Sequence, residues 1–298
     1  MEQHCVRQRS VRLLLAFLLW SPAAFAQATI VQISDTHIGL STAPNALQHL
    51  QTVVNQINAM SPQPDAVILS GDIGETTSAW TTAKNTLAGL KATIYFCPGN
   101  HDIHTTNIAT YRQYFGNDYY SFKINNITFM VVDSQLLGNY DTFNSSATPA
   151  SVQPLPASVQ TESDTMLAWL GQQTAVANEI AVQHVPLFPQ SLSGGGTYPS
   201  TNPYWAIYDV QNDTNIHHEY RTEEINALTA LNIHKMLAGH WHNQRNFTAT
   251  SGSFTLDLRM APAVAYAIGT GAQVGYTVHT ISSTGVVTTQ MVACNGCL

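Results

Sequence analysis

Charged side chains are scarce in this sequence, and positive charge is the scarcest kind. Of 298 residues, 10% are Asp, Glu, Lys or Arg, only 11 are Lys or Arg, and the formal net charge is −7. Proteins bind the phosphate backbone of nucleic acids through surfaces rich in Lys and Arg. Long nucleic acids are therefore poor candidates for the main partner, although small nucleotides stay open.

The sequence also lacks internal repeats, low-complexity tracts and a linker between two domains, which argues against a repetitive structural protein. A hydrophobic fraction of 44% is typical of a folded globular protein, and this length allows one large domain with a sizeable core. Histidine, by contrast, is abundant: its 12 residues outnumber Lys and Arg together. This ratio is the first indication of metal chemistry.

The N-terminal apolar run is too short to cross a bilayer. Residues 13–20 give eight strongly apolar positions, whereas a spanning helix needs about 20. Three arginines precede the run and a small-residue cleavage motif follows it, namely Arg7, Arg9, Arg12 and Ala24-Phe25-Ala26. This is the pattern of a signal peptide. We expect residues 1–26 to be removed after Ala26, residues 27–298 to form a single domain, and the protein to be secreted or periplasmic; an uncleaved signal anchor is the alternative.

Cysteine is rare for an exported protein, with four residues in all. Cys5 lies in the expected signal peptide, and Cys97 ends a hydrophobic run as a small buried residue would. Cys294 and Cys297 flank an Asn-Gly pair and could close a small disulfide, which export would permit. A redox role or zinc binding by this pair alone is less favoured.

The hydrophobic pattern predicts an α/β fold. Apolar runs of strand length alternate with helical periodicity in the first hundred residues, and strands dominate the end of the chain. The expected strands are 29–33, 66–69, 93–96, 119–124, 127–132, 180–183, 235–238, 247–250, 253–258, 263–268, 274–280 and 285–293, and the expected helices are 47–60, 80–90, 163–175 and 223–231. Two irregular stretches, 134–160 and 187–218, are long enough to be functional lids.

Polar residues follow five of the expected strands. They are Asp35-Thr36-His37, Gly71-Asp72, Gly99-Asn100-His101-Asp102, His184 and Gly239-His240-Trp241-His242. Ligands of α/β sheets bind at the carboxyl ends of strands. Carboxylate, imidazole and amide oxygen together suit first-row divalent or trivalent metals and exclude a thiolate zinc site. Seven candidate ligands are too many for one tetrahedral ion and suit two ions that share a carboxylate.

The ordered set DxH…GD…GNHD…H…GHxH resembles the calcineurin-like metallophosphoesterase superfamily, over Asp35 to His242. The resemblance implies a four-layer αββα sandwich, in which two mixed β-sheets pack together with helices outside. It also implies the ligands of two metal ions (Fe, Mn or Zn), a bridging ligand and a catalytic pair. Asp35, His37 and His242 would hold one ion, and Asn100, His184 and His240 would hold the other. Asp72 would bridge both ions. His101 would be the catalytic histidine, with Asp102 to orient its ring.

The activity implied by the resemblance is hydrolysis of a phosphomonoester or phosphodiester, by attack of a metal-bridging hydroxide on phosphorus. Purple acid phosphatases carry a Tyr shortly after the GD motif, and phosphoprotein phosphatases carry an Arg in GDxVDRG. Here the motif continues Gly71-Asp72-Ile73-Gly74-Glu75, with neither. The sequence therefore looks more like the phosphodiesterase branches that share DxH.

Two other functions remain as alternatives. A binding protein or pseudoenzyme could hold metals in the same fold, but every expected ligand and His101 are present. A nuclease is disfavoured by the few basic residues. The expected partner is a small phosphate ester, for which a nucleotide is one candidate; no membrane span is expected, and the pattern gives no oligomeric state.

Several residues outside the motifs have two readings. His104 reads more readily as a solvated loop residue than as a pocket residue. An aromatic side chain of Tyr204-Trp205 could stack on a base or sugar, and core packing is equally consistent. His217-His218 could arch over the metals, and Asp133 and Asp141 could be turn residues.

Overall fold

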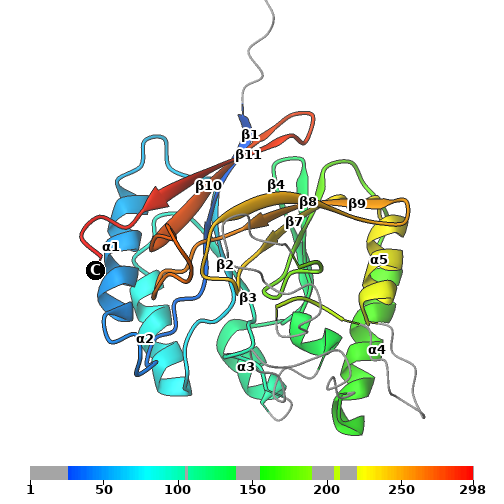
Figure 1. The fold of residues 1–298 in the computed structure, drawn as a ribbon, viewed down its shortest axis with the longest axis horizontal. Helices are drawn as coiled ribbons and strands as arrows, with labels where there is room; N and C mark the ends of the chain where they lie inside the picture. Colours follow the sequence, from blue (N-terminus) through cyan, green and yellow to red (C-terminus); the bar gives the residue numbers. More distant parts are fainter. Residues whose placement is uncertain (1–25, 105–106, 139–154, 190–204, 209–219, 298) are drawn as a thin grey trace, which may run out of the picture.

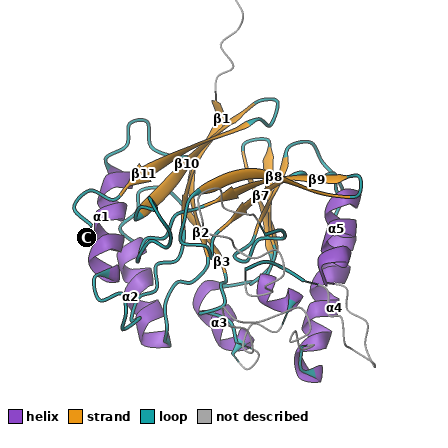
Figure 2. Cartoon of the chain, in the orientation of Figure 1, coloured by secondary structure: helices purple, strands orange, loops and turns teal. Residues whose placement is uncertain are grey.

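Two mixed β-sheets form the centre of the molecule, and helices cover the outer face of each (Figures 1 and 2). The computed structural model describes residues 26–104, 107–138, 155–189, 205–208 and 220–297. Helices α1 and α2 lie on one side of the sheets and α4 and α5 on the other. The predicted four-layer αββα sandwich is confirmed.

The first sheet has the strand order β11-β10-β1-β2-β3. Its strands are β1 (Ala26–Ile33), β2 (Ala66–Ser70), β3 (Ile94–Cys97), β10 (Gly275–Ser282) and β11 (Val287–Ala293). β1, β2 and β3 run parallel, whereas β10 is antiparallel to both β1 and β11. The carboxyl ends of the three parallel strands therefore meet at one edge.

The second sheet has the order β4-β5-β6-β7-β9-β8. Its strands are β4 (Tyr120–Ile124), β5 (Ile127–Val131), β6 (Glu179–Val182), β7 (Lys235–Ala238), β8 (Arg245–Ser251) and β9 (Phe254–Met260). β5, β6, β7 and β9 are parallel, and the outermost strands β4 and β8 are antiparallel to their neighbours. Strands β6 and β7 end beside the parallel strands of the first sheet.

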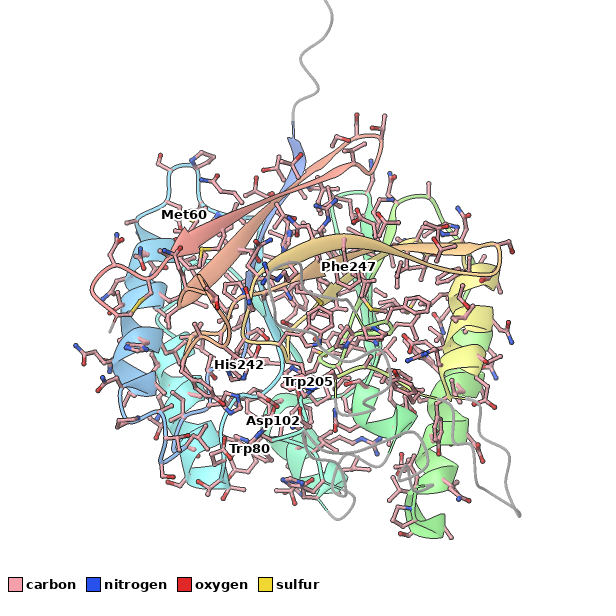
Figure 3. All side chains as sticks on the ribbon, viewed as in Figure 1. Met60, Trp80, Asp102, Trp205, His242 and Phe247 are labelled. Carbon is pink, nitrogen blue, oxygen red and sulfur yellow. A yellow bond between two sulfur atoms is a disulfide. The ribbon has the colours of Figure 1, made fainter. Side chains whose placement is uncertain are left out.

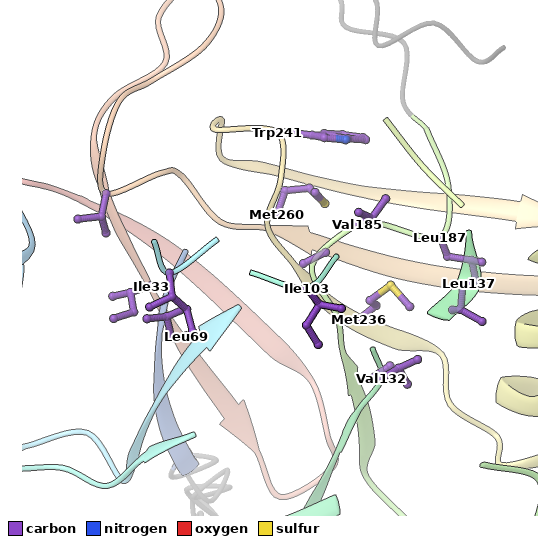
Figure 4. Packing of buried hydrophobic residues seen from close by; sticks show 14 of the residues in the cluster. Ile33, Leu69, Ile103, Val132, Leu137, Val185, Leu187, Met236, Trp241 and Met260 are labelled. Carbon is purple, nitrogen blue, oxygen red and sulfur yellow. The ribbon is translucent and has the colours of Figure 1, made fainter. Parts of the chain in front are cut away.

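Side chains alternate between two buried clusters along the central strands. Ile68 of β2 and Phe129 of β5 belong to the cluster between the sheets, whereas their neighbours Val67 and Met130 belong to the cluster under the helices. Strands buried on both faces carry continuous apolar runs because each face packs against another layer. Figure 4 shows part of the cluster under the helices, in which Val185, Leu187 and Trp241, from the segments after β6 and β7, pack with Met260 at the end of β9.

The helices are short, and α1 is clearly amphipathic. They are α1 (Ala46–Asn58), α2 (Thr77–Leu87), α3 (Ile108–Phe115), the 3-10 turn η1 (Ser134–Leu137), α4 (Ala157–Gly171) and α5 (Tyr220–Ala230). In α1, Leu50, Val53, Val54 and Ile57 lie on the buried face at helical spacing. The side chain of Thr76 caps α2 by accepting a hydrogen bond from the Ala79 N–H.

The structure differs from the sequence expectations in three elements. Residues 263–268 form no strand; instead, Val264 and Ala265 donate backbone hydrogen bonds to Ser34 and Asp35 beyond the end of β1. Helix α3 was not expected, and α4 begins six residues before the expected 163. Most of the two suggested lids, with Asp141, Tyr204 and His217-His218, lies outside the described residues, as does nearly all of the expected signal peptide.

Of the three cysteines in the described ranges, two form a disulfide and one is free. Cys294 and Cys297 form a disulfide with Cα atoms 5.5 Å apart, and Cys97 is a free buried thiol between the sheets.

Within the described ranges, none of the helices has the length and apolarity that crossing a bilayer requires.

A buried acid in α5 makes stability depend on pH. Glu224 is fully buried, and burial raises the pKa of its carboxyl to about 8. Because a raised pKa favours the protonated form, the fold is stabilised below pH 4.5 and loses this contribution as pH rises towards 8. We expect Glu224→Gln to raise the melting temperature at pH 8 and leave it nearly unchanged at pH 4.5. A thermal scan at both values checks this; equal shifts at both pH values would contradict it.

Candidate metal centre and active site

The five sequence motifs converge at the edge where the two sheets meet. Asp35 and His37 follow β1, Asp72 follows β2, and Asn100 to Asp102 follow β3. His184 follows β6, and His240 and His242 follow β7 in the other sheet. Asp102, Trp205 and His242 are labelled in this region in Figure 3. All the predicted carboxylate and histidine ligands are buried.

The donor atoms fall into three groups: two share the Asp72 carboxylate, and the third consists of His37, Glu75 and His101. Asp35, His37, Asp72 and His242 offer ligand atoms within 4.8 Å of one another, and so do Asp72, His184 and His240. The Asp72 Oδ2 atom lies 3.4 Å from His37 Nε2 and 3.1 Å from His184 Nε2. Asp72 is thus positioned between the two groups, as a bridging ligand has to be.

Outer hydrogen bonds fix which nitrogen of each histidine faces the centre. The backbone oxygens of Ser70 and Tyr266 lie 2.7 Å and 3.0 Å from Nδ1 of His184 and His242. A carbonyl oxygen only accepts, so each Nδ1 carries a proton and, in the neutral ring, Nε2 carries the lone pair. Both rings therefore point a free lone pair at the centre.

His37 is held in the same way by a carboxylate. Its Nδ1 lies 3.0 Å from Glu75 Oε1, and its Nε2 lies 3.1 Å from the Nε2 of His242. Two lone pairs at this distance repel unless a proton or a cation lies between them. Neutral histidines oriented by outer partners are typical metal ligands.

Another buried atom of the centre lacks a hydrogen bond. It is the Oδ1 atom of Asn100, whereas the buried Nε2 atom of His184 has only the Asp72 carboxylate oxygen, 3.1 Å away, as a partner. Buried polar atoms in native proteins almost always have a hydrogen bond. Together with the converging lone pairs, the unpartnered Asn100 oxygen shows that the residues present fit bound metal ions.

The ligand turns adopt unusual backbone angles. Asp35, His37, Asp72, His240 and His242 all have positive φ, between 41° and 71°. This conformation costs a non-glycine residue roughly 1–3 kcal/mol and is concentrated at functional sites. Glycine is required beside them, because a Cβ on Gly99 would lie 2.2 Å from Asp72 Oδ1.

The two innermost carboxylates are ionised. Burial alone would raise the pKa of Asp35, but His242 and His184 outweigh it and lower the value to about 2. Burial would also raise the pKa of Asp72, but the neighbouring His184 and His101 outweigh this effect and hold the pKa well below its usual range. A proton on the His184 Nε2 atom and a metal ion compete for one lone pair, so metal binding should release protons.

His101 differs from the ligands because its side chain is 31% exposed. Its Nδ1 lies 2.9 Å from Glu75 Oε2, and its backbone N–H donates to Asp72 Oδ1. Burial opposes the charged ring, but Asp72 and Glu75 raise its pKa to about 9. The ring is therefore a cationic donor at the open side of the centre, as its predicted contact with substrate requires.

Asp102 does not orient His101 as the resemblance implied. Its buried carboxylate accepts hydrogen bonds from the backbone N–H groups of Ile73, Gly74 and Gly99. It therefore joins the turns after β2 and β3. The carboxylate that holds the His101 ring is Glu75, which the sequence reading quoted only as part of the GD loop.

An aromatic ring lies beside a histidine of each of the two donor groups that contain Asp72. The Trp205 ring is 5.7 Å from the His240 ring, and the Tyr266 ring is 4.3 Å from that of His242. For Trp205, stacking on a base or sugar and core packing were both open; the ring lies beside the expected ligand His240 and also packs against the hydrophobic core. Tyr266, in the segment expected to be a strand, was missed. Asp133 caps the η1 turn, as its alternative reading held, and His104 is exposed.

The Glu75 carboxylate contacts the Nδ1 atoms of both His37 and His101, so we expect turnover to depend on its charge more than on its size. A glutamine can accept from only one Nδ1–H, and the other ring must then change tautomer or lose its partner. We expect Glu75→Gln to lower turnover by about 10–100-fold, the usual effect of removing an outer partner of a metal ligand. The measurement is kcat together with metal affinity, and the control is Glu162→Gln, an exposed carboxylate paired with Arg112. Wild-type values for both parameters would contradict the assignment.

The fold and the donor set define a metal-dependent phosphoesterase. The profile of calcineurin-like phosphoesterases matches residues 28–244, and the chain belongs to this family.

Curated relatives carry two kinds of name. The serine/threonine-protein phosphatase CPPED1 of Mus musculus is 25% identical over 281 residues, 84% of this chain and 77% of that protein. The Bos taurus protein of that name is 24% identical, over 74% of this chain and 65% of its own length. The probable glycerophosphodiester phosphodiesterase GpdQ of Arcobacter nitrofigilis is 28% identical, over 77% of this chain and 81% of its own. The name of CPPED1 describes a protein phosphatase, a class that the sequence analysis disfavoured because the arginine of GDxVDRG is missing here.

Solved structures show the same fold at low identity. GAP50, the anchor in the inner membrane complex of Plasmodium, aligns with a TM-score of 0.52 and 12% identity, over 90% of this chain and 85% of its own. The purple acid phosphatase PPD1 from yellow lupin aligns with a TM-score of 0.52 and 10% identity, over 90% and 52% of the two chains.

Proposed function

We propose that the protein is an exported phosphoester hydrolase that works with two metal ions. The observation that carries this is the position of Asp72 in both donor groups, 3.4 Å from His37 and 3.1 Å from His184. Asp35, His37 and His242 would hold one ion, Asn100, His184 and His240 the other, and Asp72 both. When bound, such ions supply Lewis acidity that activates water and polarises the phosphoryl group.

The protein's own side chains supply positioning and a proton. Glu75 holds the Nδ1 atom of the His101 ring, and 31% of the His101 side chain is exposed. A protonated ring there stabilises negative charge on the phosphoryl oxygens and can pass its proton to the departing oxygen. Asp102 keeps the two turns that carry Asp72 and Asn100 at a fixed distance.

Export is supported by the charge and apolar pattern of residues 1–26. Both kinds of relative have names that describe hydrolysis of phosphate esters. Fe, Mn and Zn all accept this set of carboxylate, amide and imidazole donors.

The test is hydrolysis of p-nitrophenyl phosphate and bis-p-nitrophenyl phosphate by purified protein, stripped of metal and then reloaded with Mn, Fe or Zn. Metal-dependent turnover with at least one ester supports the proposal. The Asp72→Asn protein, prepared in parallel, identifies any contaminating phosphatase. Absence of turnover with two ions bound per chain would overturn it in favour of a metal-holding binding protein.

A further inference from the structure

Two polar side chains, Gln32 and Ser70, are buried in the layer between the two sheets. Gln32 lies on the same face of β1 as Ile30, and Ser70 lies on the same face of β2 as Ile68, because side chains two positions apart in a strand share a face. Ile30 and Ile68 belong to the apolar cluster between the sheets. Gln32 and Ser70 therefore continue this layer towards the ligand turns, and both are fully buried.

The side-chain amide of Gln32 bonds to both sheets at once. Its Nε2 atom donates to Ser70 Oγ, 2.8 Å away, and to the backbone oxygen of Ala238, 3.1 Å away. Ser70 is the last residue of β2 in the first sheet, and Ala238 is the last residue of β7 in the second. A backbone oxygen only accepts, so the atom that faces Ala238 is the NH2 group of the amide. Each of its two protons therefore has an acceptor on a different sheet.

A neutral histidine holds the amide in this orientation. Gln32 Oε1 lies 2.9 Å from His279 Nε2, and an amide oxygen only accepts, so this Nε2 carries a proton. The Nδ1 atom of the same ring accepts from the hydroxyl of Thr289, 2.9 Å away. Burial lowers the pKa of His279 to about 3, which keeps the ring uncharged. A flipped Gln32 amide would place two buried N–H groups against each other, and such unsatisfied donors are costly.

The two strand ends approach each other closely just beyond the amide. Gly239 follows Ala238, and a Cβ on Gly239 would lie 2.0 Å from Ser34 Oγ and 2.9 Å from the backbone oxygen of Ser70. A glycine at a strand end is typical of such a close approach of two backbones. A change in the spacing of the sheets at this point would therefore displace the ligand turns directly.

The strand ends that the amide joins supply one donor group. Asp72 comes two residues after Ser70, and His240 comes two residues after Ala238. The third member of the group, His184, donates from Nδ1 to the backbone oxygen of Ser70. All three ligands therefore depend on where the ends of β2 and β7 lie relative to each other.

The histidines of the other donor group have different supports. The Nδ1 atom of His37 bonds to Glu75, and that of His242 bonds to the backbone oxygen of Tyr266. Neither bond involves Gln32. Loss of the amide should therefore affect one metal position more than the other.

From these contacts we propose that Gln32 is a positioning residue of the metal centre. Its amide holds the ends of β2 and β7 at the spacing that the donor group of Asp72, His184 and His240 requires. This inference rests on the proposed function, because it concerns the same two-ion centre. It adds a residue that lies outside the ligand motifs, three positions before Asp35.

The test is calorimetric titration of Mn²⁺ into metal-free wild-type protein and into Gln32→Met, which keeps the length of the side chain and removes the amide. We expect one of the two binding steps to weaken by about 10–100-fold, the usual effect of removing an outer support of a metal ligand. The other step should stay close to its wild-type value. Leu50→Ala, in the buried face of α1, is the control, because it lowers stability at a distance from the layer between the sheets. Both of its binding steps should match the wild type.

A double-mutant cycle checks that the effect passes through the amide. Ser70→Ala removes the hydroxyl that accepts from Gln32 and leaves the Ser70 backbone oxygen in place. We expect this change to weaken the same binding step in the wild-type background and to have a much smaller effect in the Gln32→Met background. Melting temperatures of all variants check that each of them is folded.

Two results would overturn the inference and leave the proposed function standing. In the first, both binding steps of Gln32→Met match the wild type; in the second, both weaken to the same extent. If Gln32→Met does not fold, Ser70→Ala decides the question by the same two criteria. If the wild-type protein binds fewer than two Mn²⁺ ions, the inference fails, and the ester assay then decides whether the proposed function fails with it.

Discussion

Asp72→Ala is expected to lose metal binding and turnover together. The Asp72 carboxylate is the one group that lies in both donor clusters, and it is buried between His37 and His184. Its removal takes a ligand from each ion and takes the nearest carboxylate from His184, which keeps the longer 3.8 Å contact to Asp35. We expect the fall in kcat to exceed the roughly 10²–10³-fold typical of losing one stabilising donor.

Metal content by mass spectrometry and kcat on the better of the two nitrophenyl esters measure this effect. Asp257→Ala is a matched control, because Asp257 forms an ion pair with Arg259 and lies opposite Lys235, the first residue of β7, at the end of that strand away from the ligands. A normal metal content in Asp72→Ala would disprove the bridging assignment, even if activity were lost.

His101→Ala should separate catalysis from metal binding. The ring is the exposed member of the site and belongs to neither donor group that contains Asp72. Its loss removes a proton donor and a positive charge from the substrate side. We expect metal content near normal and a decrease in kcat of about 10²–10⁴-fold, the usual range for a general acid.

The proton-donor role has its own signature. An ester with a good leaving group, such as p-nitrophenolate, needs little protonation, so His101→Ala should harm alkyl esters more than nitrophenyl esters. His234→Ala serves as the control, since His234 is exposed at the start of β7. Equal losses on both kinds of ester would show that His101 contributes charge and position rather than a proton.

The sequence predicts most of the ligand set because that set depends on strand ends. Asp35, Asp72 and His184 each come within a few residues of a largely apolar run of strand length, and parallel strands bring such positions to one edge whatever the intervening loops do. The residues that were missed depend on turn geometry instead. Asp102 directly follows His101, yet in the tight turn after β3 the two side chains point to different partners.

Glu75 and Tyr266 show the same limit. Glu75 reaches two histidines because the segment after Asp72, where φ is 54°, stays paired with the segment after His37 through the parallel bridge between Ile38 and Gly74. The run 263–268 has the apolar composition of a strand, but its hydrogen bonds go to Ser34 and Asp35, so tertiary contacts override the local preference. Such contacts join residues more than 200 positions apart, and no local pattern contains them.

Because the ligands come from both sheets, the geometry of the metal centre depends on how the two sheets are positioned relative to each other. The turns after β1, β2 and β3 bring four of the seven expected ligands, and those after β6 and β7 bring the other three. The spacing between the two sets is set by the layer of side chains between the sheets, including Ile68, Cys97, Phe129 and Val182. Bound ions would clamp the sheets at one edge, much as a cross-link does. A change of one methylene in that layer would then alter metal affinity and specificity with every ligand intact.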